Sequence, residues 1–254
     1  MNALFSRCSL IPLLAALLGA APAVQAQPMP EEEVMLSAAR QGNLELFREM
    51  LKLGASAHAR DAAGNNALVL AVQGDSDAML REVLAQQLSP NAVGSAGMSA
   101  LSLAVMRNRE AMFNRLLQAG AEPDTTDATG GSALHTAVRL GRTRMALALL
   151  AAGARADRPD GQRVTPLHIA AERGDAVLSQ ALLSHGANPN GLDAEGRTPL
   201  FIALFERQSD VAALLARHRM TDVQTPVQGY SPLFWAQQMA MVDVAQAMAQ
   251  RGVR

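Results

Sequence analysis

The chain has 254 residues, enough for one or two ordinary domains or for one extended array of repeats. Hydrophobic residues make up 49% of the chain and aromatic residues only 3%, so its core must consist of Ala, Leu, Val and Met side chains rather than large rings. The formal net charge of −1 supplies no strong field for nucleic acid or an anionic membrane, which argues against both as partners.

The first segment, residues 1–26, has the pattern of a secretory signal peptide. Arg7 is its only charged residue, and an apolar stretch rich in Leu and Ala follows over residues 10–24. We expect cleavage after Ala26, or nearby after Ala23. The alternative is an uncleaved anchor helix, but four prolines interrupt the long uncharged span. The predicted location is therefore the periplasm, with secretion from the cell as the alternative.

The single cysteine, Cys8, lies within this segment and lacks the preceding residues that would mark a lipoprotein. The mature chain would then contain no disulfide and no thiol nucleophile. Its stability would have to come from packing alone.

A short motif recurs through the rest of the chain at a constant step of 33 residues. Each copy starts with Asn, Ser or Thr, continues with Ala or Pro and then Leu, and has an alanine three residues after that Leu. The six copies begin at Asn66, Ser99, Ser132, Thr165, Thr198 and Ser231, and one further step back places Met35 and Ala38 in register. A period of this length indicates a solenoid. We expect a repeat domain over residues 27–254 with seven repeats, at about 31–60, 61–93, 94–126, 127–159, 160–192, 193–225 and 226–254.

Two short helices are predicted in each repeat. The Asn, Ser or Thr side chain can accept a hydrogen bond from a free backbone N–H at a helix start, and Ala or Pro suits the first helical position. Gly42, Gly141 and Gly174 are placed to end the first helix in their repeats. The second helix carries an apolar pair and usually closes with Gly-Ala, and a turn rich in Asp and Gly then leads onward.

Three repeats depart from this pattern. The first has Glu33 in place of the capping residue, and Pro30 followed by three glutamates is expected to open its helix instead. The second and sixth repeats have Gln87 and Arg219 where the closing glycine is expected, which leaves the loop geometry open at these two places.

The fifth repeat resembles a near-consensus ankyrin repeat. It reads TPLHIAA at 165–171 and GANPN at 186–190, and SALHTA at 132–137 resembles the same motif. The resemblance covers about residues 31–254. It implies an all-α solenoid of antiparallel helix pairs, with one outward hairpin loop per repeat and a concave face.

No residue set points to catalysis, a cofactor or a metal site. The resemblance implies that His135 and His168 tie neighbouring hairpins together by hydrogen bonds. His185 and His218 fall near the ends of second helices, where a cation suits the helix dipole. No two histidines have the close spacing of a zinc pair, and no nucleophile elbow or phosphate loop is present in the sequence. We therefore expect a protein that is not an enzyme and takes no cofactor.

The resemblance implies that partners meet the hairpin tips and the exposed face of the first helices. The candidate contact residues, called the interaction strip below, mix apolar side chains with charged ones, as binding patches do. They are Met106, Arg107, Arg139, Leu140, Glu172, Arg173, Arg197, Phe205, Glu206, Tyr230 and Met239. The alternative is that the Met and Leu side chains only pack against adjacent helices.

The predicted function is that of a monomeric protein-interaction scaffold or adaptor in the periplasm, with no nucleic-acid partner and no membrane contact after signal cleavage. The main alternative is an inhibitor or immunity protein that neutralises a periplasmic enzyme or toxin. A third possibility is delivery out of the cell into a host.

Overall fold

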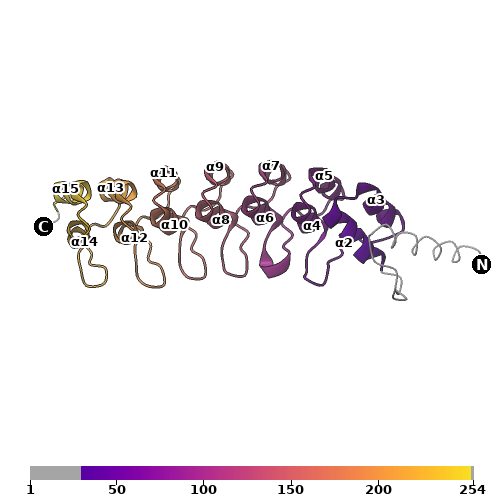
Figure 1. The fold of residues 1–254 in the computed structure, drawn as a ribbon, viewed down its shortest axis with the longest axis horizontal. Coiled ribbons are helices and arrows are strands. Elements are labelled where there is room, and N and C mark those ends of the chain that lie inside the picture. The colour runs from indigo at the N-terminus through magenta and orange to yellow at the C-terminus, as the bar shows by residue number, and fades with distance from the viewer. Residues whose placement is uncertain (1–29, 253–254) are drawn as a thin grey trace, which may run out of the picture. The chain divides into compact units, whose positions relative to one another are not determined.

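The computed structural model describes residues 30–252, so the predicted signal peptide lies outside the described residues. The chain divides into an N-terminal body that ends at Leu88 and a C-terminal body that begins at Ser89. Fourteen α-helices make up the described part, and within residues 30–252 the only β-structure is a set of isolated bridges at the bases of hairpins. The predicted all-α repeat fold is confirmed (Figure 1).

The N-terminal body contains the first two repeats. Its helices are α2 (Glu31–Gln41), α3 (Leu44–Lys52), α4 (Ala67–Gln73) and α5 (Asp77–Ala85). Helix α2 contacts α3 and α4, and α5 contacts α3 and α4. Pro30 precedes α2 and all three glutamates lie in its first turn, as the sequence predicts.

The C-terminal body contains five helix pairs and one short 3-10 turn (Ser95–Gly97). The first helices of the pairs are α6 (Ala100–Met106), α8 (Ala133–Arg139), α10 (Pro166–Arg173), α12 (Pro199–Phe205) and α14 (Pro232–Gln238). The second helices are α7 (Glu110–Gln118), α9 (Thr143–Ala151), α11 (Ala176–Ser184), α13 (Ser209–Arg217) and α15 (Val242–Gln250). Within this body the even-numbered helices form one row and the odd-numbered helices another, and the hairpin loops project from the even row (Figure 1).

The predicted capping residues stand at the N-termini of the first helices. The Asn66 side chain accepts a hydrogen bond from the Val69 N–H, and Ser99, Thr198 and Ser231 each accept from the N–H three residues ahead. Because these helices have only seven or eight residues, such caps satisfy a large share of their unpaired N–H groups.

The core lies between the two rows, and the motif residues form it. The motif alanines are fully buried, as are the motif leucines of five repeats, whereas Leu233 of the seventh repeat is only half-buried. The buried leucines are Leu68, Leu101, Leu134, Leu167 and Leu200. The longest described helix has 11 residues, too short to cross a bilayer.

A left-handed residue follows every first helix, at a position that recurs each 33 residues. Glycine fills it at the three predicted places. Other residues take the same positive φ in the remaining repeats, namely Asp75 (58°), Asn108 (57°), Arg207 (57°) and Ala240 (56°). The turn geometry is therefore imposed by the fold and does not depend on glycine.

The two loops left open by the sequence behave differently. In the second repeat Gln87 keeps the left-handed conformation of the closing glycine, with a φ of 59°. In the sixth repeat α13 ends differently, because His218 is extended (φ −67°, ψ 120°) and Arg219 is not left-handed. The residue buried after this helix is consequently Thr221, while Met220 is 63% exposed.

Candidate functional site

The hairpin loops are held in shape by an aspartate at the same position in four repeats. One carboxylate oxygen, Oδ1, of each accepts hydrogen bonds from the N–H groups two and four residues ahead. The four residues are Asp61, Asp127, Asp160 and Asp193. Each hairpin is therefore rigid before any partner arrives.

Backbone hydrogen bonds also join successive hairpins of the C-terminal body. The N–H groups of Ala128, Gly161 and Ala194 donate to carbonyl oxygens of the preceding hairpin at 2.8–2.9 Å. At Gly161 the approach is so close that a β-carbon would lie 2.7 Å from the Thr129 carbonyl oxygen. The hairpin tips of the third to sixth repeats thus form one connected surface.

His135 and His168 tie these hairpins to the even-numbered helices, as the sequence predicts. Nδ1 of His135 accepts the Ser132 N–H at 3.2 Å, and its Nε2 lies 3.2 Å from the Val164 carbonyl oxygen of the next hairpin. His168 repeats the arrangement with the Thr165 N–H and the Arg197 carbonyl oxygen. Since Nδ1 accepts a backbone N–H, this network assigns the proton to Nε2.

Both imidazoles are neutral structural groups. Burial lowers the pKa of His135 and His168 below the usual 6.5, although the carbonyl oxygens bound to Nε2 partly oppose this effect. With both ring nitrogens already engaged, neither histidine is available as a general base. Within residues 30–252 no group of three potential metal ligands comes together.

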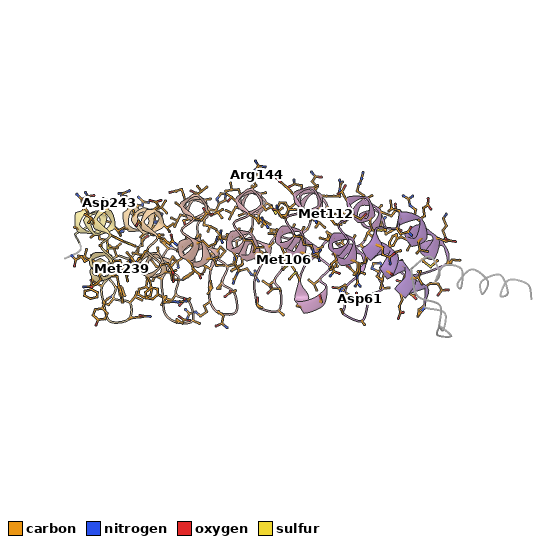
Figure 2. The ribbon with its side chains drawn as sticks, in the orientation of Figure 1. Asp61, Met106, Met112, Arg144, Met239 and Asp243 are labelled. Carbon is orange, nitrogen blue, oxygen red and sulfur yellow. The ribbon has the colours of Figure 1, made fainter. Side chains whose placement is uncertain are left out.

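The apolar members of the interaction strip lie on the even-numbered helices or at their ends. Met106 is 42% exposed, Leu140 41% and Phe205 53%, whereas Met239 is half-buried. Figure 2 labels Met106 and Met239 on the even-helix side of the C-terminal body and Arg144 on the opposite side. Three of the four apolar residues therefore offer accessible surface.

Several charged members of the strip are already used within the chain. Arg173 donates from Nη1 to the Arg139 carbonyl oxygen at 2.8 Å, which caps the end of the neighbouring α8. Arg197 pairs with Asp193 at 2.8 Å and with Glu195 at 3.0 Å. Glu172 and Glu206 are exposed near the ends of α10 and α12, and Arg107 is exposed at the end of α6.

An aromatic cluster in the sixth and seventh repeats is a feature that the sequence reasoning missed. The rings of Tyr230 and Phe234 stack at a centroid distance of 4.5 Å, and Trp235 meets the rings of Phe201, Tyr230 and Phe234 edge-on at 5.5–5.9 Å. Phe205 stacks on Phe201 at 6.0 Å and, like Tyr230, is more than half exposed. The signal was present, because these five rings belong to a chain with only eight aromatic residues.

This cluster replaces the histidine tether. Phe201 and Phe234 stand 33 and 66 residues after His168, at the same motif position. Ring stacking thus takes over at the end of the array where the histidine hydrogen bonds stop. The exposed edge of the cluster adjoins the strip through Phe205 and Tyr230.

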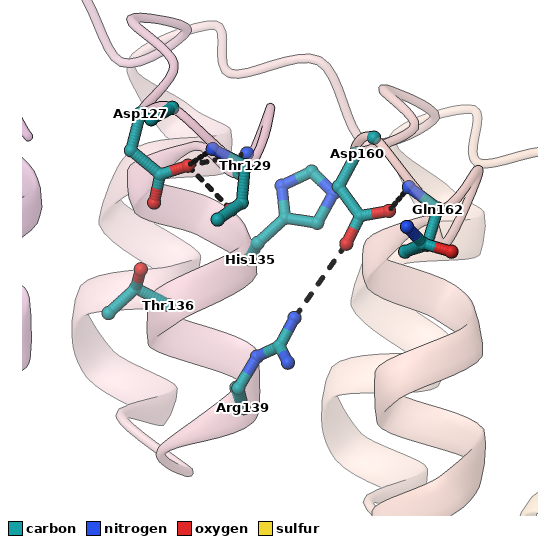
Figure 3. A pocket seen from close by; sticks show the side chains of 10 residues that line it. Asp127, Thr129, His135, Thr136, Arg139, Asp160 and Gln162 are labelled. Carbon is teal, nitrogen blue, oxygen red and sulfur yellow. Dashed lines mark hydrogen bonds and ion pairs between the residues drawn. The ribbon is translucent and has the colours of Figure 1, made fainter. Parts of the chain in front are cut away.

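A cavity of about 570 Å³ opens between the hairpins of the fourth and fifth repeats. Asp127, Thr129, Asp160 and Gln162 line it from the hairpins, and Arg139 lines it from α8 (Figure 3). The Arg139 guanidinium approaches Asp160 only to 3.8 Å, which is an ion-pair distance but not a hydrogen bond. The cavity is polar and lies on the same side as the strip.

Comparisons with known proteins agree with this architecture. The family model for ankyrin repeats (three copies) matches residues 34–127, 82–160, 101–191, 134–227 and 167–254. A comparison with curated protein sequences finds no match.

Among solved structures, 527 chains match, so the fold alone does not specify a partner. One of them belongs to the Bd0816 predatory endopeptidase from Bdellovibrio bacteriovorus in complex with immunity protein Bd3460. The similarity has a TM-score of 0.65 at 22% sequence identity and covers 74% of this chain and 98% of that chain. At this identity the similarity shows a shared fold.

Proposed function

Since this chain belongs to the ankyrin-repeat family, we propose that it is a non-catalytic module that binds a protein partner on its hairpin tips and on the exposed face of its even-numbered helices. The observation that carries the proposal is the aromatic cluster joined to the strip, with Phe205 53% and Tyr230 51% exposed. Tyr and Trp are the residues most enriched where binding energy concentrates.

The rest of the strip fits a supporting role. Exposed Met106 and Leu140 add apolar contact area, and the rigid hairpins reduce the entropy lost on binding. Arg173 and Arg197 are held by hydrogen bonds or ion pairs within the chain, so they contribute a fixed positive rim. We therefore place the main anchor at the aromatic end.

Paired capture from a periplasmic extract tests this function. The bait is the chain from residue 27 onward, compared with a Phe205→Ala/Tyr230→Ala variant and with a Leu147→Ala/Val177→Ala control. Leu147 and Val177 are 40% and 64% exposed on the odd-numbered helices. We expect the control to recover the same protein as the wild type and the aromatic variant to lose it. Equal recovery by all three baits rejects the proposed face.

The role of the bound complex separates an adaptor from an inhibitor. The inhibitor or immunity role gains support from the similar structure, which holds an endopeptidase bound to an immunity protein. An inhibitor would abolish the activity of its partner at a one-to-one ratio, whereas an adaptor would leave that activity unchanged or raise it. Titration of the captured partner with the purified chain distinguishes the two.

We also propose that the mature protein acts in the periplasm, on the strength of the apolar stretch at residues 10–24 and the small residues after it. N-terminal sequencing of the protein from fractionated cells tests this proposal. A new N-terminus at Gln27 in the periplasmic fraction supports it. An intact Met1, or recovery from the cytoplasm or the culture medium alone, contradicts it.

A further inference from the structure

The four hairpin aspartates differ in what binds their second carboxylate oxygen, Oδ2. In all four, Oδ1 accepts two backbone N–H groups of the hairpin. At Asp61, Oδ2 accepts from Arg40 at 2.9 Å and from Asn65 at 3.1 Å. At Asp193, Oδ2 accepts from Nε of Arg197 at 2.8 Å. Where the chain supplies a donor to this oxygen, an arginine is thus part of the arrangement.

The same oxygen lacks a close donor in the two hairpins between these sites. The residue four positions after the aspartate is Asn65 or Arg197 in the filled hairpins, but Gly131 and Val164 in the other two. Within the described chain, the nearest cation to Asp160 is Arg139 at 3.8 Å, and no cation pairs with Asp127. These two aspartates are the ones that line the 570 Å³ cavity.

We propose that the cavity between the fourth and fifth hairpins receives an arginine side chain of the bound protein, whose guanidinium donates to Oδ2 of Asp127 and of Asp160. This inference rests on the proposed function, because it names a chemical feature of the partner. The guanidinium would complete in these hairpins the contacts that Arg40 and Arg197 make in theirs.

The charges around the cavity favour a cation. Asp127 and Asp160 are fixed by their own hairpins, and hydrogen bonds from Thr129 and Gly131 hold the pKa of Asp127 below its usual value despite partial burial. His135 is neutral and already engaged, and Arg139 is the one cation of the lining. Two carboxylates and one guanidinium leave a net charge of −1.

Arg139 does not block the entry of a second guanidinium. Its side chain is 61% exposed, whereas that of Asp160 is 11% exposed, so Arg139 can move while the carboxylate cannot. A planar guanidinium has several N–H donors in a fixed fork, which suits two carboxylates that converge from neighbouring hairpins.

The test needs no identified partner. We would titrate the mature chain, labelled with nitrogen-15, with N-acetyl-arginine methylamide at low salt and follow backbone amide shifts by NMR. The neutral control is the citrulline analogue, which has the same shape without the charge. We expect saturable shifts for residues 127–131 and 160–164 with the arginine probe only. The filled hairpins at 61–65 and 193–197 serve as internal references and should not respond.

A single substitution should fill the site from within. Val164 is the equivalent of Arg197, so Val164→Arg places the chain's own guanidinium beside Asp160. We expect this variant to bind the arginine probe at least about tenfold more weakly, and Val164→Met, which adds bulk without charge, to bind within about twofold of the wild type.

Equal shifts from both probes, no saturable shift at all, or full binding by Val164→Arg would overturn the inference. Its failure differs from that of the proposed function. Loss of the partner from the Phe205→Ala/Tyr230→Ala bait together with no response to the arginine probe rejects only the arginine site. A response to the probe together with equal capture by every bait rejects only the proposed binding face.

Discussion

His135 and His168 make the stability of the fold dependent on pH near neutrality. Burial lowers the pKa of both groups below the 6.5 of an exposed imidazole, so between the two values the unfolded chain binds more protons than the folded chain. Stability then rises with pH in that range and falls on acidification below about 6.5. We expect a lower urea midpoint at pH 5.5 than at pH 7.5. The carboxylates Asp61, Asp127 and Asp193 have lowered pKa values and stay ionised throughout this window.

A matched variant assigns this effect to the histidines. His168→Gln keeps a neutral side chain that can hydrogen-bond but cannot titrate near neutrality, so the drop in urea midpoint between the two pH values should shrink. A pH dependence as large as that of the wild type in a His135→Gln/His168→Gln variant would contradict the assignment.

Ser179 is a buried polar residue in an otherwise apolar position. Its side chain is fully buried in α11 and its hydroxyl has no hydrogen-bond partner. Ala146 and Ala212 occupy the equivalent position in the adjacent repeats and are also fully buried. Ser179→Ala should therefore stabilise the protein by about 1 kcal/mol, measured by urea unfolding. A loss of stability would show that the hydroxyl has a partner in solution.

At the scale of elements, the turns between paired helices contain residues in an unfavourable conformation. Arg207 has a φ of 57° at the place where Gly174 stands in the preceding repeat. A non-glycine residue loses roughly 1–2 kcal/mol in this region. Arg207→Gly should therefore raise the free energy of unfolding by about 1 kcal/mol. The same change at Arg81, in the interior of α5, should lower it by about 1 kcal/mol, and melts that gave both variants the same sign would refute the argument.

These elements also show how far the sequence reaches. The capping residues and the 33-residue step predicted the start of each first helix, because caps act locally and leave a local signal. The left-handed residues Asp75, Asn108, Arg207 and Ala240 left none, since their conformation is imposed by the helix pair that they join. Arg173 was predicted as a contact residue, and its bond to the Arg139 carbonyl oxygen emerged only once the two repeats were placed side by side.

The unusual end of α13 depends on an arginine from the next repeat. Nη1 of Arg251 donates to the carbonyl oxygens of Ala216 and His218, and Nη2 donates to those of Arg219 and Thr221, at 2.9–3.2 Å. These carbonyls would otherwise end a helix without a left-handed glycine. Arg251→Ala should cost about 1–3 kcal/mol and speed hydrogen exchange over residues 214–221. Arg251→Lys keeps the charge but not the fork, and full rescue by Lys would contradict this explanation.

At the scale of the whole molecule, the sequence predicted the repeat fold more completely than the candidate site. The fold follows from a motif that recurs seven times, whereas the cavity depends on two single departures from the hairpin pattern, Gly131 and Val164. The aromatic cluster likewise depends on rings at two motif positions that hold histidine in other repeats. Features that set one repeat apart from its neighbours have no periodicity to reveal them.

Repeat architecture also predicts that one substitution has different costs along the array. Leu167 and Leu233 occupy the same motif position, but Leu167 is fully buried in α10, which contacts α8, α11 and α12, while Leu233 is half-buried in α14, which contacts α12 and α15. Stability in such arrays is close to a sum of repeat and nearest-neighbour terms. Leu167→Ala should therefore cost about 2–5 kcal/mol, and Leu233→Ala clearly less. Urea melts of the two variants decide this, and equal losses would mean that the described helices unfold without regard to their neighbours.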